Sequence, residues 1–138
     1  WEAAWRLYSW MGGTDGRQQS RMRSAHDVSE GGLLVAIAES MLARGFGARI
    51  ELSAQESIWK MAFGEGFHSF VISCSENDAA ELEAEWTGLG LSFQRLGEVT
   101  KTGMLEVATA GGGPANKPLW SVGVQELRTS WKREGYWE

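Results

Sequence analysis

The sequence predicts an α+β fold in which a mixed β-sheet is flanked by layers of helices, with a partly ferredoxin-like order of elements. Two observations predict it: segments of β type alternate with helical ones, and two β-type segments near the end are separated by a short turn. A third observation is that no repeat, charge block or linker divides the 138 residues. We therefore expect residues 1–138 to form a single domain.

The expected helices follow from apolar periodicity and from end signals. Leu33, Ile37 and Met41 recur at a spacing of four with a second apolar row beside them, which predicts a helix over about 31–44. Gly45 is its natural C-cap. The other expected helices are residues 2–11, a short helix ending near residue 60, residues 76–87 with Ser75 as N-cap, and residues 122–132.

The expected strands are short segments rich in β-branched and aromatic residues, or alternating in polarity, between turn signals. They comprise a segment ending near Val28 and residues 48–52, 69–74, 92–99 and 104–109. The turn at residues 100–103 contains Gly103, so we expect the last two strands to pair as a hairpin.

Composition excludes several classes of protein. The net charge is −5 and the sequence pI about 5.1, which argues against nucleic acid and membranes as partners. One cysteine, Cys74, and two histidines exclude a disulfide framework and make a metal cluster of Cys or His unexpected. No apolar run reaches the length of a membrane span and no signal-peptide pattern is present, so we expect a cytoplasmic setting. Because the chain starts at Trp1 rather than Met, we expect a processed or excised piece.

The strongest local signal for chemistry lies where a strand leads into the helix at residues 31–44. The first turn of a helix has unpaired N–H groups and a partial positive charge, and Gly31 and Gly32 have no side chains to keep a phosphate away. Asp27 can hold Mg²⁺ through one carboxylate, and the Ser29 hydroxyl can donate to a phosphate. A structural alternative stands beside it: Ser29 caps the helix, the glycines allow the helix to pack closely on the sheet, and Asp27 satisfies a turn.

Residues 26–39, HDVSEGGLLVAIAE, resemble the stretch H-D-x-S-[DE]-G-G-L-x-V-A-x-A-E of phosphoribosylformylglycinamidine synthase, the PurL family. Two weaker segments follow in the family's order. Residues 63–66 with 69–73 are similar to its L-F-[SG]-E-x and R-F-V-V segments, and residues 96–100 to its R-L-G-x-V-T segment. The resemblance covers roughly residues 22–109.

The resemblance implies an AIR-synthase-type C-terminal domain from an enzyme that converts formylglycinamide ribonucleotide to its amidine with ATP and ammonia. In that family the Asp of this stretch helps hold Mg²⁺ and the Ser contacts the nucleotide, roles that fall on Asp27 and Ser29. Glu30 replaces an Asp found in many members. The other Mg²⁺ ligands and the catalytic His lie in other domains. We therefore expect no catalytic residue and no activity in this chain alone, at most residual Mg²⁺ and ATP or ADP binding, and the remainder of the synthase as partner.

Eight tryptophans stand against five phenylalanines and two tyrosines, and the family stretches do not require them. Trp is enriched in interface hot spots because it buries much area with few rotors. An alternative function is therefore a Trp-rich protein-binding module, a natural-domain scaffold with a re-engineered surface, or a chain that self-associates. The candidate interface residues are Trp1, Trp5, Tyr8, Trp10, Trp59 and Trp86. The plainer interpretation is that about half of the tryptophans fill the core.

Overall fold

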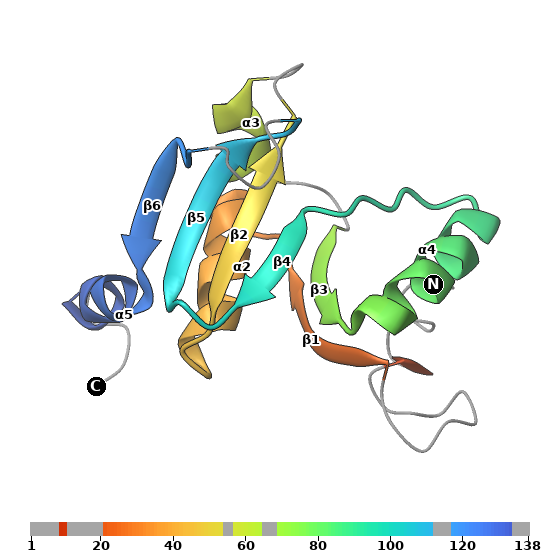
Figure 1. The fold of residues 1–138 in the computed structure, drawn as a ribbon, viewed down its shortest axis with the longest axis horizontal. Helices are drawn as coiled ribbons and strands as arrows, with labels where there is room; N and C mark the ends of the chain where they lie inside the picture. The colour runs from red at the N-terminus through yellow and green to blue at the C-terminus, as the bar shows by residue number, and fades with distance from the viewer. Residues whose placement is uncertain (1–8, 11–20, 54–56, 65–68, 112–116, 134–138) are drawn as a thin grey trace. The chain divides into compact units, whose positions relative to one another are not determined.

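The structure, a computed structural model, describes residues 9–10, 21–53, 57–64, 69–111 and 117–133. The chain divides into two units, each built from two separate stretches. Unit 1 comprises Trp1–His26 and Phe70–Arg95, and unit 2 comprises Asp27–Ser69 and Leu96–Glu138. Helices and strands alternate as expected (Figure 1). That residues 1–138 act as a single domain stays a prediction.

Unit 2 contains a four-stranded mixed sheet in the order β4-β2-β5-β6 (Figure 1). Strand β2 is antiparallel to β4 and parallel to β5, and β5 is antiparallel to β6. This confirms the expected mixed sheet with flanking helices. The elements of unit 2 are, in chain order, α2 (Gly32–Leu42), β2 (Gly47–Leu52), α3 (Ile58–Phe63), β4 (Gly97–Thr100), β5 (Met104–Thr109), β6 (Trp120–Gly123) and α5 (Val124–Arg133).

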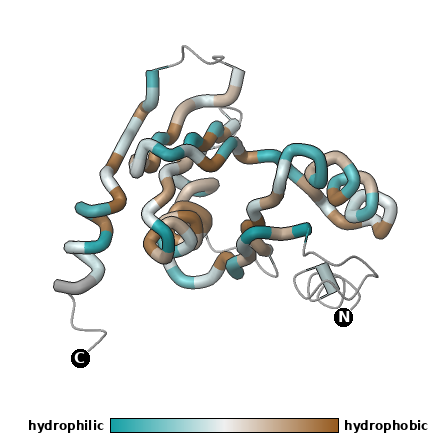
Figure 2. The backbone as a smooth tube through the Cα atoms, turned by 60° about the horizontal axis from the view of Figure 1, so that its bottom comes forward, coloured by the Kyte–Doolittle hydropathy of each residue, from teal (hydrophilic) through white to brown (hydrophobic). Residues whose placement is uncertain are grey.

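One face of this sheet is apolar, because side chains alternate between the faces along each strand. Ile50 is in register with Val107, and Ala48 with Leu105, and all four are buried. Helix α2 carries the matching apolar surface, with Leu34, Ile37 and Met41 among its buried residues, and Figure 2 draws this helix mainly in the hydrophobic colour. Burial of these two surfaces against each other forms the core of unit 2.

The other face of the sheet is polar. Arg49 is in register with Glu98 on one side and with Glu106 on the other, which places opposite charges next to each other across three strands. Glu51 occupies the same face two residues further along β2. A sheet with one apolar and one polar face needs helices on one side only. This agrees with the alternation of apolar and polar residues along β2, Gly47–Leu52.

The expected hairpin between residues 92–99 and 104–109 is wrong. Strands β4 and β5 do not pair with each other, since β2 lies between them and bonds to both. The strand in question also begins at Gly97 rather than residue 92. A turn signal in the sequence predicts that the chain reverses direction. It does not predict whether a third strand lies between the two strands that the turn connects.

The C-terminal helix was expected from residue 122, and the structure begins it at Val124. The two residues before it belong to β6, a strand of four residues that the sequence pattern did not reveal. Its signal is weak because a strand this short offers little alternation, and Gly123 weakens the β propensity further.

Unit 1 contains a two-stranded sheet and a helix. The strands β1 (Met22–Asp27) and β3 (Phe70–Cys74) are joined by a hydrogen bond of 2.6 Å between the hydroxyls of Ser24 and Ser73, and α4 spans Glu76–Gly88. The buried core consists of Trp10, Met22 and Leu82, and partly buried residues pack against it, namely Ile72, Cys74, Trp86 and Phe93.

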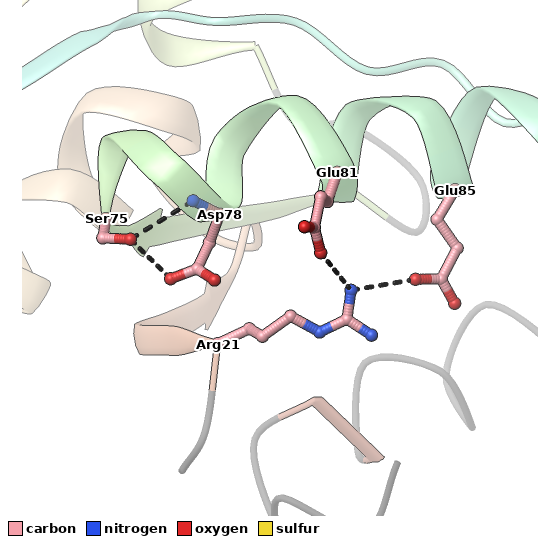
Figure 3. A network of polar contacts seen from close by, with 5 residues as sticks. All are labelled: Arg21, Ser75, Asp78, Glu81 and Glu85. Atoms are coloured by element: carbon pink, nitrogen blue, oxygen red, sulfur yellow. Dashed lines mark hydrogen bonds and ion pairs between the residues drawn. The ribbon is translucent and has the colours of Figure 1, made fainter. Parts of the chain in front are cut away.

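The predicted N-cap of α4 is confirmed. The Ser75 hydroxyl oxygen accepts a hydrogen bond from the backbone N–H of Asp78 at 3.2 Å, and the hydroxyl donates to the Asp78 carboxylate (Figure 3). The first bond satisfies one of the N–H groups that a helix leaves open at its start, and Asp78 places a negative charge at the positive end of the helix.

The side chain of Arg21 connects the N-terminal stretch of unit 1 to α4. Its Nη1 lies 3.1 Å from an oxygen of Glu85 and 3.9 Å from one of Glu81 (Figure 3). Its guanidinium carbon lies 5.5 Å from the centre of the Trp10 ring, within the range of a cation–π contact. The Arg21 side chain is only 9% exposed, so its charge is compensated by groups of the protein rather than by solvent alone.

The structure describes only residues 9 and 10 of the helix expected at 2–11, and both are helical. The rest of that helix lies outside the described residues. Within the part of the chain that is described, no helix is long and apolar enough to cross a membrane.

Candidate functional site

The candidate site is the segment Asp27–Gly32 of unit 2, at the junction of β1 and α2. Two backbone hydrogen bonds fix this segment. The N–H of Val28 donates to the carbonyl of Ser69 at 2.9 Å, and the N–H of Gly32 donates to the carbonyl of Ser29 at 3.0 Å. The second bond closes a tight turn, and the side chains of Asp27 and Ser29 are exposed beside it.

The two glycines of this turn have different surroundings. Gly31 is exposed with φ +80, and a Cβ there would lie 2.6 Å from Cγ2 of Val35. Gly32 is buried with φ +75, and a Cβ there would lie 2.5 Å from the carbonyl carbon of Phe63. Gly32 is thus required by the close approach of α2 to the end of α3, and its N–H is already used in the turn. Only Gly31 leaves its backbone open to a ligand from solvent.

The alternative in which Ser29 caps the helix is wrong. The N-cap of α2 is Gly31, two residues further along the chain. A Ser at the N-cap would accept a bond from an N–H inside the first turn, and Ser29 lies too early for that role. Packing explains Gly32, as the structural alternative stated, although the neighbour is the backbone of α3 rather than the sheet.

Asp27 supplies a single exposed carboxylate at the end of β1. Among the residues that the structure describes, there is no group of three or more His, Cys, Asp or Glu side chains arranged to hold a metal ion. A Mg²⁺ bound at Asp27 would therefore take its other ligands from water, from a nucleotide or from groups outside the described residues.

The remaining candidates for chemistry have plain structural environments. His26 is half-buried in β1, whereas His68 lies outside the described residues. Burial raises the pKa of the Cys74 thiol, the nearby Asp78 carboxylate adds to the rise, and Arg95 opposes it. The thiol therefore stays protonated at neutral pH, where a thiol is a poor nucleophile.

The candidate interface tryptophans divide into different classes. Trp10 is 1% exposed and its ring lies 5.1 Å from that of half-buried Trp86, tilted by 44°. Trp10 is therefore part of the core of unit 1, and Trp86 packs against it. The expectation that Trp10 is an interface residue is wrong. Trp59 is 73% exposed and stacks on Phe63, with ring centres 6.0 Å apart and planes within 14°. Trp1, Trp5 and Tyr8 lie outside the described residues.

Sequence reasoning missed two residues that matter for these surfaces. Phe63 is 47% exposed and completes the aromatic pair with Trp59, and their spacing of four residues on one helix was a usable signal. Arg21 is buried beneath Trp10, and no local pattern distinguishes it from the other arginines of the segment before β1.

Comparisons with family models and with curated proteins identify the family of this chain. A family model described as "AIR synthase related protein, C-terminal domain" matches residues 15–109, which is more than half of the chain. The phosphoribosylformylglycinamidine synthase subunit PurL of Deinococcus radiodurans is 40% identical over 111 residues, covering 79% of this chain and 14% of that protein. The PurL subunit of Synechococcus elongatus is 37% identical over 120 residues, covering 84% and 15%.

Solved structures share the fold. Thermotoga maritima PurL complexed with ATP superposes with a TM-score of 0.66 and 20% identity, over 77% of this chain and 18% of that chain. The same protein complexed with AMPPCP gives a TM-score of 0.67. The chain thus spans about one seventh of the length of the curated relatives given above. It belongs to the family of AIR synthase related protein C-terminal domains, and among these it resembles the domain found in PurL.

Proposed function

We propose that this chain is the nucleotide-contacting C-terminal domain of a phosphoribosylformylglycinamidine synthase, which carries out ATP-dependent amidation of formylglycinamide ribonucleotide in purine biosynthesis. The observation that carries the proposal is the exposed trio of Asp27, Ser29 and Gly31 at the start of α2, within the stretch that resembles the family's H-D-x-S segment.

Each member of the trio has a distinct role in this proposal. The Asp27 carboxylate binds Mg²⁺, the Ser29 hydroxyl donates to a phosphate oxygen, and the N–H groups near Gly31 face the phosphate at the positive end of α2. Bound Mg²⁺ would supply positive charge that offsets the charge of the phosphates. Gly32 shapes the turn without contacting the nucleotide, because it is buried against Phe63.

The chain on its own is inactive in this proposal. Phosphoryl transfer needs several groups that position the phosphate and stabilise its charge, and the described residues hold no group of three or more His, Cys, Asp or Glu side chains that could bind a metal ion. The rest of the synthase supplies the other groups and is therefore the expected partner. The relatives support this, since the matched domain is a small share of each PurL subunit.

Calorimetry with ADP and Mg²⁺ tests the nucleotide site. We expect weak binding to the chain, in about the 10–100 μM range, and at least a tenfold loss in Asp27→Ala. Glu76→Ala is the matched control, because it removes another exposed carboxylate, from the first turn of α4. Equal binding by the chain and by Asp27→Ala would refute the role of Asp27, and loss in both variants would indicate a general charge effect.

A second candidate function, protein binding, is favoured by one specific observation, the exposed stack of Trp59 and Phe63. In this proposal the stack packs against the remainder of the synthase. Mixing the chain with a synthase lacking this domain tests it by restoration of activity. We expect Trp59→Ala to need at least about tenfold more chain for half-restoration than Trp59→Phe, which keeps an aromatic ring. Equal requirements would exclude Trp59 from the interface.

A further inference from the structure

The outer edge of β6 differs from the opposite edge of the same sheet. Among the described strands, β4 and β6 each bond to a neighbour on one side only. Strand β4 also exposes an apolar residue, Val99, but next to it stands the exposed charge of Glu98, the kind of residue that discourages pairing between sheet edges. Strand β6, Trp120–Gly123, has no charged residue, Trp120 is 45% exposed, and the preceding Leu119 is 60% exposed.

The hydrogen-bond pattern shows which groups of β6 point outward. The N–H of Val124 donates to the carbonyl of Gly103. These two residues lie just outside the pair Met104 and Gly123, so that pair is of the type whose N–H and C=O groups do not bond to each other. Pairs alternate along an antiparallel ladder, so Val122 bonds to β5 and Ser121 does not. The N–H and C=O of Ser121 therefore point away from β5, toward the open edge.

We propose that β6 pairs antiparallel with β6 of a second copy of this chain, so that two four-stranded sheets join into one. The backbone fixes the register. The outward-pointing N–H and C=O of Ser121 meet the same groups of Ser121 in the second copy, on the two-fold axis, and form two hydrogen bonds. Trp120 then lies opposite Val122 of the second copy, and the apolar faces of the two sheets continue into each other.

The side chains favour a second copy as the occupant of this edge. Trp120 and Val122 share the apolar face, since they are in register with Val107 and Leu105, and pairs of an aromatic with a β-branched residue stabilise antiparallel strands. Ser121 lies on the polar face, in register with Glu106, and a serine opposite a serine brings no like charges together. The strand is thus complementary to itself on both faces. This inference is independent of the nucleotide site.

Sedimentation velocity on the 138-residue chain tests the proposal, over concentrations from about 5 to about 500 μM, the range of a small interface. We expect a monomer–dimer equilibrium and protection of the Ser121 amide from hydrogen exchange that increases with concentration. Ser121→Pro removes the central donor while leaving the bonds to β5 in place, and Ser121→Thr keeps it. We expect the dissociation constant to rise at least about tenfold in Ser121→Pro and to change little in Ser121→Thr.

A second variant keeps the proposal testable if Ser121→Pro fails to fold. Ser121→Lys places two like charges on the axis, so we expect its dimer to be weakened at low salt and partly recovered at about 1 M salt. Circular dichroism confirms that each variant is folded. A chain that stays monomeric throughout the range overturns the proposal. A folded Ser121→Pro or Ser121→Lys that dimerises as the parent chain does also overturns it, because the dimer must then use another surface.

Discussion

Two aromatic pairs in this protein contain the same residue type in opposite environments. Trp10 and Trp86 lie in unit 1, where Trp10 is 1% exposed and touched by the guanidinium of Arg21. Trp59 and Phe63 lie on α3 of unit 2, where Trp59 is 73% exposed. The first pair is part of the folded core, whereas the second exposes an aromatic surface to solvent. The described tryptophans therefore do not all have the same structural role.

Trp10→Ala should give the largest effect, because it removes a fully buried ring and leaves a cavity. We expect the free energy of unfolding to fall by about 3–5 kcal/mol, measured by denaturant unfolding of the 138-residue chain. Trp10→Phe keeps part of the volume and should lose less. If Trp10→Ala were as stable as the parent chain, the difference between the two aromatic pairs would disappear.

Gly32→Ala tests the close contact between the start of α2 and Phe63, one member of the exposed aromatic pair. A Cβ at this position collides with the backbone of Phe63 and forces a residue with a side chain to adopt φ +75. We expect a loss of about 2–3 kcal/mol and greater protease sensitivity near α3. Gly45→Ala is the control, since Gly45 also has a positive φ, +72, but no heavy atom would lie within 4 Å of its Cβ. Equal losses in the two variants would mean that backbone strain, rather than contact with α3, explains the effect.

Arg21→Met tests how much the charge of Arg21 stabilises the core around Trp10. The change removes the cation–π contact with Trp10 and the ion pairs with Glu81 and Glu85, while keeping the length of the side chain. We expect destabilisation by about 1–2 kcal/mol in thermal unfolding. Arg95→Met removes an exposed ion pair with Glu83 and should cost no more than about 0.5 kcal/mol. A loss in Arg95→Met equal to that in Arg21→Met would show that burial does not distinguish these arginines.

Trp59→Ala should have the smallest effect on stability, within about 0.5 kcal/mol, because little of the ring is buried. Fluorescence provides a direct comparison. We expect iodide to quench the parent chain more than Trp59→Ala, since the variant lacks an accessible indole. Trp10→Phe removes a shielded indole, so it should raise the accessible fraction slightly instead of lowering it. Equal quenching of Trp59→Ala and the parent chain would contradict the exposure of Trp59.

The sequence predicts those features that depend on residues close together in the chain, such as helix caps and helix periods. Ser75 was identified as an N-cap because capping depends on residues three apart, and the helix at Leu33, Ile37 and Met41 was identified from its period. Pairing of β2 with β4 and β5 was not predicted, because no short segment encodes which distant strand will be its neighbour. Burial of Trp10 was missed for the same reason, since its contacts come from α4 and from Arg21. The separate roles of Gly31 and Gly32 also required the position of α3.

The placement of β2 between β4 and β5 has a kinetic consequence. Residues 47–52 pair with residues that lie between 47 and 57 positions later in the chain, so a long loop must close before any pairing stabilises the strand. Contacts of this separation slow folding relative to a helical bundle of equal size. During synthesis, Ile50 and Leu52 leave the ribosome before Leu105 and Val107 exist to cover the strand beside them. The partly synthesised chain thus exposes the apolar residues of β2, and α2, which is already complete by then, is the element best placed to shield them from aggregation.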